Sequence, residues 1–204
     1  GMLQATKYLV KYYSGTRNLC LYQDLDGDNG DWEFMCDSDF AGNAEKQNKR
    51  RSQSGHLAKV GTAHVWGSKP SSVWHDAHDI VCTASPRIIG AHADMSSGAS
   101  EVYAMGNASI DLLHLGYCME ESHIDFPQVI NLQVDNTTAE AFANNTVTKS
   151  KLKHIDCRQE WVKTLRDSSI FSVTHVDTKY NLADFFTKIL QGPRFRELRD
   201  QFMV

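Results

Sequence analysis

The order of its periodic segments is what most constrains the fold of this chain. The segment 19–40 predicts two strands around a turn at Asn29-Gly30, and further strand-like runs of β-branched and aromatic residues occur at 55–61, 64–69, 129–135 and 170–176. Helical periodicity marks 99–117, 137–145, 153–167, 181–190 and 193–204. This order predicts an α/β fold: a mixed five-stranded sheet, antiparallel in its early strands and parallel in its later ones, flanked by helices.

Two helices have readable apolar stripes. In 99–117 the predicted stripe is Val102, Met105, Ile110, Leu113 and Leu115, and in 153–167 it is Ile155, Trp161, Val162 and Leu165. An N-terminal helix over 2–14 would place Leu3, Tyr8, Leu9 and Tyr12 on roughly one face. Residues 70–95 show no clear period.

Composition narrows the class of protein. The 204 residues are 41% hydrophobic and 23% charged, which suits one globular domain with a short appended segment. No run of about 18 apolar residues occurs, so no membrane span is predicted. The net charge of -4 excludes a uniformly basic nucleic-acid binder, so such binding would need a local patch. Five scattered cysteines predict reduced thiols and an intracellular protein.

Four carboxylates lie where strands end or helices begin. Asp37 lies in a strand, Asp135 closes 129–135, and Glu101 and Asp184 are expected in the first turns of their helices. Each alone fits the ordinary preference for acidic residues at helix N-termini. Together, at one sheet edge, they would repel one another unless cations neutralised them. Such oxygen ligands favour Mg²⁺ or Mn²⁺, and paired divalent ions promote in-line displacement at phosphorus.

Six motifs in order make a resemblance visible. They are CDSDFAG (36–42), RRSQSGHL (50–57), ADMSSGASEVYAM (93–105), QVDNTTA (133–139), SKLKHIDCRQEWV (150–162) and NLADFFTK (181–188). With them the chain resembles the ribonuclease H domain of Ty1/copia-type retrotransposon polyproteins. The resemblance implies that residues 1–30 join a reverse transcriptase to a ribonuclease H-like domain over 31–204.

The resemblance implies an activity and its ligands. Asp37, Glu101, Asp135 and Asp184 would hold two Mg²⁺ ions, or Mn²⁺, and cut the RNA strand of RNA–DNA hybrids. Asp37 would bridge both ions, with Asp39 as its rival. Products would carry 5′-phosphate and 3′-hydroxyl ends.

Further residues carry weaker predictions. His175 matches a histidine that assists proton transfer or product release, against the alternative of a surface side chain at a strand end. Asn136 could contact a 2′-hydroxyl or simply cap a helix. The nucleic-acid contacts predicted beside Asn136 are Lys49, Arg50, Arg51, Ser54, Lys153 and His154.

Two alternatives stay open on the sequence. One is a degenerate ribonuclease H-like module that binds nucleic acid or serves as a structural part of a polyprotein without cutting. The other keeps the fold but changes the chemistry, to a structure-specific nuclease or an integrase-like transferase. The resemblance also implies a tethered reverse transcriptase domain and a cytoplasmic virus-like particle.

Overall fold

The computed structural model describes residues 2–21, 31–40, 52–61, 63–70, 97–144 and 157–203. Its strands are β1 (Trp32–Asp39), β2 (Gln53–Val60), β3 (Ala63–Pro70), β4 (Ile130–Val134) and β5 (Phe171–His175). Its helices are α1 (Met2–Gly15), α3 (Ser97–Glu121), α4 (Thr137–Ala143), α5 (Cys157–Asp167), η2 (Thr178–Tyr180), α6 (Asp184–Thr187) and α7 (Gly192–Arg199). The helix predicted over 181–190 is therefore reduced to one turn.

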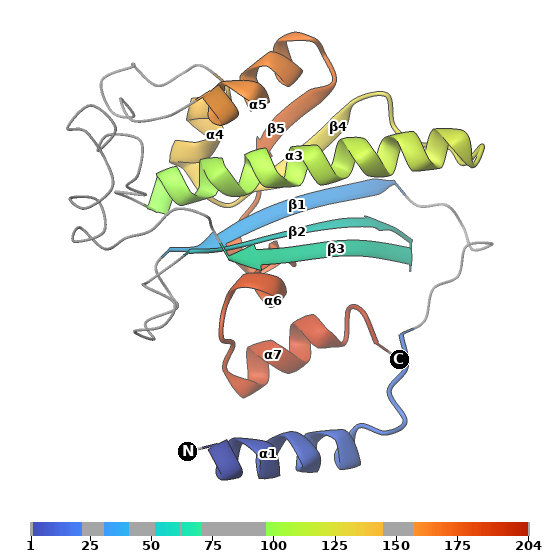
Figure 1. Ribbon diagram of the computed structural model, residues 1–204, viewed down its shortest axis with the longest axis vertical. Helices are drawn as coiled ribbons and strands as arrows, with labels where there is room; N and C mark the ends of the chain where they lie inside the picture. Colours follow the sequence, from blue (N-terminus) through green and yellow to red (C-terminus); the bar gives the residue numbers. More distant parts are fainter. Residues whose placement is uncertain are drawn as a thin grey trace.

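The five strands form one mixed sheet in the order β3-β2-β1-β4-β5. Strands β1, β2 and β3 pair antiparallel, whereas β4 pairs parallel with both β1 and β5. Figure 1 shows α3, α4 and α5 on one side of the sheet and α6 and α7 on the other. The predicted architecture is confirmed, and it places the ends of the parallel strands β1 and β4 side by side.

The core lies between α3, α4, α5 and the sheet. The residues of α3 that it contains differ in part from the predicted apolar stripe. Val102 and Met105 are fully buried as predicted, but Ile110 is 55% exposed and Leu112 takes its place. A residue spacing of 102, 105 and 112 follows the helical period, while position 110 rotates away from the sheet. In α5, likewise, Val162 is buried and Trp161 is 41% exposed.

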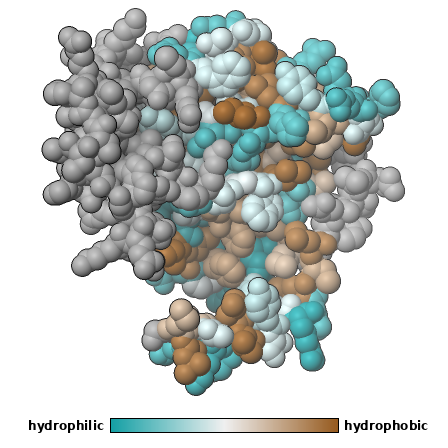
Figure 2. All heavy atoms as spheres, in the orientation of Figure 1, coloured by the Kyte–Doolittle hydropathy of each residue, from teal (hydrophilic) through white to brown (hydrophobic). Residues whose placement is uncertain are grey.

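Helix α1 stands apart from this core. It contains no buried residue, and its ring contact with the domain is Tyr12 against Phe195, with centroids 5.7 Å apart. An isolated bridge joins Leu21 to Met203. Figure 2 shows brown, apolar side chains on this helix at the lower end of the molecule. The boundary between 1–30 and 31–204 stays a prediction.

The described residues also bear on membrane spanning and on the state of the cysteines. No helix among them is both long and apolar enough to cross a membrane. Cys20, Cys36 and Cys118 are free thiols, as predicted.

Candidate metal centre

Three of the four predicted carboxylates meet at one edge of the sheet. Asp37 lies near the end of β1, Asp135 directly follows β4, and Glu101 projects from α3. Ligand oxygens of all three lie within 4.8 Å of one another. The parallel pairing of β1 with β4 brings the first two together, and α3 crosses the sheet to supply the third.

Glu101 is the carboxylate whose surroundings fit a cation best. It is 4% exposed, and its Oε1 accepts a hydrogen bond from the Ser38 N–H at 3.2 Å. Its Oε2 is buried without a hydrogen-bond partner among the described residues. Burial, together with the nearby Asp37 and Asp135, raises the pKa of Glu101 to about 9. A buried, unpartnered carboxylate oxygen beside two further carboxylates suits a hard divalent ion.

Glu101 also corrects a detail of the sequence prediction. It is the fifth residue of α3 as described, and no acidic residue lies in the first turn of that helix. A favourable interaction with the helix dipole in the first turn therefore does not explain why Glu101 lies where it does.

Asp37 occupies the centre of the site and is fully buried. The Thr187 hydroxyl donates a hydrogen bond to its Oδ2, and Lys188 Nζ lies 3.0 Å from its Oδ1. Burial raises the pKa of Asp37, although the Lys188 ammonium and the Thr187 hydroxyl oppose that rise. Asp39 does not belong to the group of converging carboxylates, so the geometry favours Asp37 at the central position.

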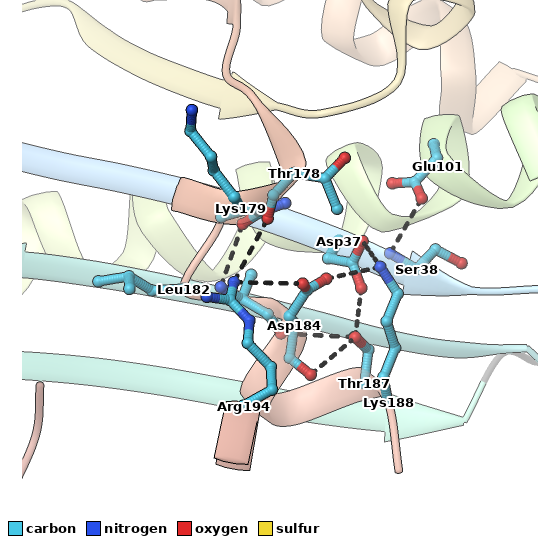
Figure 3. A network of polar contacts seen from close by, with 12 residues as sticks. Asp37, Ser38, Glu101, Thr178, Lys179, Leu182, Asp184, Thr187, Lys188 and Arg194 are labelled. Carbon is cyan, nitrogen blue, oxygen red and sulfur yellow. Dashed lines mark hydrogen bonds and ion pairs between the residues drawn. The ribbon is translucent and has the colours of Figure 1, made fainter. Parts of the chain in front are cut away.

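Asp184 lies on the other side of Asp37 and is not one of the three converging ligands. Its Oδ1 is 2.5 Å from Lys188 Nζ, and its Oδ2 is 3.7 Å from Arg194 Nη2. Figure 3 shows the Lys188 side chain reaching between Asp37 and Asp184, with Glu101 on the far side of Asp37. The fourth predicted carboxylate is therefore connected to Asp37 through a lysine.

Close packing of α6 on the sheet positions this half of the site. Gly55 of β2 pairs with Asp37, and a Cβ atom on Gly55 would lie 2.7 Å from Thr187 Cγ2 and 3.0 Å from Phe186 Cβ. Only glycine lets α6 approach so closely. Gly55 thus allows Thr187 to reach Asp37.

Asn181 is a positioning residue to which the sequence analysis assigned no role. It is completely buried, its Nδ2 donates to the Cys36 carbonyl at 3.1 Å, and its Oδ1 accepts from the Ala183 N–H at 3.1 Å. Asn181 thereby ties the residues that begin α6 to the strand residue next to Asp37. Its position three residues before Asp184 was the sequence feature from which a positioning role could have been predicted.

The remaining predicted residues lie in different surroundings. His175 is exposed at the end of β5 and pairs with Val134, one residue before Asp135. Asn136 caps α4, because its Oδ1 accepts from the N–H groups of Thr138 and Ala139. Ser54 is buried, with its hydroxyl 3.5 Å from Asn107 Nδ2, which leaves little surface for nucleic acid. Lys49, Arg50, Arg51, Lys153 and His154 lie outside the described residues.

Comparison with known proteins confirms the resemblance found in the sequence. The chain is 24% identical over 193 residues to the retrovirus-related Pol polyprotein from transposon TNT 1-94 of Nicotiana tabacum, covering 94% of this chain and 13% of that protein. It is 24% identical over 203 residues to the corresponding polyprotein from transposon RE1 of Arabidopsis thaliana, covering 99% of this chain and 12% of that protein. The chain thus spans about an eighth of either relative. No family model matches.

Two solved structures align with most of the chain. Ribonuclease H1 from Halobacterium salinarum NRC-1 is 12% identical with a TM-score of 0.42, covering 76% of this chain and 92% of that chain. LC11-RNase H1 in complex with an RNA/DNA hybrid is 10% identical with a TM-score of 0.45, covering 77% and 94%. The mixed sheet order and its flanking helices make the fold ribonuclease H-like, as the sequence predicted.

Proposed function

We propose that this domain is a metal-dependent ribonuclease that hydrolyses the RNA strand of RNA–DNA hybrids within a retrotransposon polyprotein. The observation that carries the proposal is the convergence of Asp37, Glu101 and Asp135 with a buried, unpartnered oxygen on Glu101. The polyprotein relatives supply the context in which such an activity would be used.

The four carboxylates would hold two Mg²⁺ ions, with Mn²⁺ as a substitute. Asp37, Glu101 and Asp135 would hold one ion, and Asp37 with Asp184 would hold the other. Ions bound there would lower the pKa of a water molecule and would stabilise negative charge on the leaving 3′ oxygen.

The chain's own residues orient these ligands. Asn181 and the close approach of α6 over Gly55 fix Asp184 relative to Asp37, while the Ser38 N–H fixes one oxygen of Glu101. His175 is exposed and pairs with Val134, the residue preceding Asp135, and it would exchange a proton with solvent near the cleaved bond. The products would carry 5′-phosphate and 3′-hydroxyl ends.

Nucleic-acid binding is proposed to use the basic segments of the sequence. Lys49, Arg50, Arg51, Lys153 and His154 would contact the phosphates of the hybrid, whose recognition at net charge -4 needs such a local patch. A tethered reverse transcriptase domain would raise the effective concentration of the hybrid at this site. The setting we propose is a cytoplasmic virus-like particle.

The decisive test incubates the chain with a labelled RNA–DNA hybrid and with duplex DNA of the same sequence, in Mg²⁺ or Mn²⁺. Asp135→Asn removes a ligand, and Asp125→Asn makes the same change at an exposed loop position away from the cluster. We expect metal-dependent cutting of the RNA strand by the wild-type chain and by the control, and none by Asp135→Asn. Hybrid binding without cutting would instead favour a degenerate module, and cutting of duplex DNA would favour a structure-specific nuclease.

A further inference from the structure

The two halves of the carboxylate cluster differ in how their charge is balanced. On one side of Asp37, Lys188 Nζ contacts Asp37 Oδ1 at 3.0 Å and Asp184 Oδ1 at 2.5 Å. Arg194 adds a second cation 3.7 Å from Asp184 Oδ2. Arg194 is shared with Glu197, whose Oε2 lies 3.1 Å from its Nη1, so Lys188 is the cation that both carboxylates of this half contact.

The other half lacks such ion pairs among the described residues. Within the described ranges, neither Glu101 nor Asp135 forms an ion pair with a basic side chain, and Glu101 Oε2 has no hydrogen-bond partner. A divalent cation entering this half therefore displaces no basic side chain. The half formed by Asp37 and Asp184 is already filled by the Lys188 ammonium (Figure 3).

We propose that Lys188 is a built-in counter-ion that occupies the position of the second divalent ion between Asp37 and Asp184, so that this ion binds only when Lys188 moves away. The inference rests on the proposed two-ion site. An ammonium and a divalent ion cannot share the same two oxygens, because like charges at about 4 Å repel strongly in a partly buried site. The ions therefore bind in order, first at Asp37, Glu101 and Asp135, then at Asp37 and Asp184.

Lys188 is placed so that it can leave. It follows the last residue of α6 with an extended backbone, and its side chain is 33% exposed to solvent. Its flexible stem can carry the ammonium into water without moving the helix. Asp184, in contrast, lies in α6 and is held near Asp37 by the contacts of Asn181. The carboxylates would thus stay in place while the cation between them is exchanged.

The test is a titration of the metal-free full chain with Mn²⁺ alone. Calorimetry and electron paramagnetic resonance of free Mn²⁺ both monitor the binding. Lys188→Met removes the ammonium and keeps most of the side-chain volume. Lys179→Met is the matched control, because Lys179 is 61% exposed and pairs with Asp177 at 3.6 Å instead of with a cluster carboxylate. We expect Lys188→Met to tighten the second Mn²⁺ at least about tenfold, with a smaller change for the first. The control should bind like the wild-type chain.

Two outcomes separate this inference from the proposed function. If the first Mn²⁺ binds and is lost in Asp135→Asn, but the second affinity is the same in Lys188→Met and wild type, Lys188 is only a structural ion pair and the inference is wrong. If the wild-type chain binds no Mn²⁺, the proposed function fails and the inference fails with it. Lys188→Gln repeats the test should Lys188→Met lose its native circular dichroism spectrum.

Discussion

The burial of Glu101 predicts an unusual pH dependence for the stability of the metal-free chain. With 4% of its surface exposed and Asp37 and Asp135 nearby, Glu101 has a pKa of about 9 in the folded chain, against an ordinary value of 4.5. The folded chain therefore holds this proton more tightly than the unfolded chain does. The stability contributed by this proton is fully present below pH 4.5 and is lost as the pH rises towards 9.

The magnitude follows from linkage between proton binding and folding. One proton retained only in the folded state gives a slope of about 1.4 kcal/mol per pH unit at 25 °C. Between pH 6 and pH 8, Glu101 should thus lower the free energy of unfolding by about 2–3 kcal/mol. Asp37 contributes in the same direction, because burial raises its pKa as well.

The assay is urea unfolding in EDTA at several pH values for the wild-type chain and Glu101→Gln. Glutamine keeps the shape of the neutral carboxyl group but has no proton to lose, so the variant should gain stability relative to wild type as the pH rises. Glu121→Gln makes the same change at the exposed end of α3 and should follow the wild-type curve. Parallel curves for wild type and Glu101→Gln would refute the reasoning, since Glu101 would then be ionised in the folded chain.

Metal binding should counteract this loss of stability at high pH. A divalent ion needs the ionised carboxylate, so Mg²⁺ competes with the proton on Glu101. We expect Mg²⁺ to raise the melting temperature of the wild-type chain more at pH 8 than at pH 6. Glu101→Gln should respond weakly at both values, and an equal response of the two proteins would exclude Glu101 as a ligand.

Three further predictions concern the residues around the carboxylates. Gly55→Ala should destabilise the chain by about 1–3 kcal/mol in urea unfolding and should reduce hybrid cleavage, because the added Cβ would collide with Thr187. Gly15→Ala is the control and should do neither, because Gly15 has open space around it. Asn181→Ala should lower the free energy of unfolding by about 1–3 kcal/mol and weaken Mn²⁺ binding, because the Cys36 carbonyl and the Ala183 N–H lose their hydrogen-bond partner. An effect no larger than that of Asn131→Ala, at an exposed position of β4, would contradict this prediction. His175→Ala should keep the stability and Mn²⁺ affinity of the wild type while lowering hybrid turnover by about 10²-fold, and unchanged turnover would leave His175 a surface residue.

Apolar periodicity predicted most of the described strands and helices, but it did not predict that the helix over 181–190 is only one turn, nor which side of a helix the fold would bury. The order of strands and helices led to the mixed sheet, because parallel and antiparallel pairing follow from the lengths of the connections. The stripe of α3 was wrong at Ile110, since both that residue and Leu112 are apolar and only the sheet decides which is covered.

Residue type and position singled out Asp37, Glu101, Asp135 and Asp184, because several carboxylates gathered at one sheet edge repel one another without cations. Only the tertiary structure shows that three of them converge while Asp184 lies across a lysine from Asp37. The roles of Gly55, Asn181 and Lys188 likewise depend on α6 packing against the sheet some 130 residues along the chain from β2. Lys188 pairs with Asp184 within one helical turn, but its contact with Asp37 and the distances between the carboxylates arise from contacts remote in sequence, which no local pattern encodes.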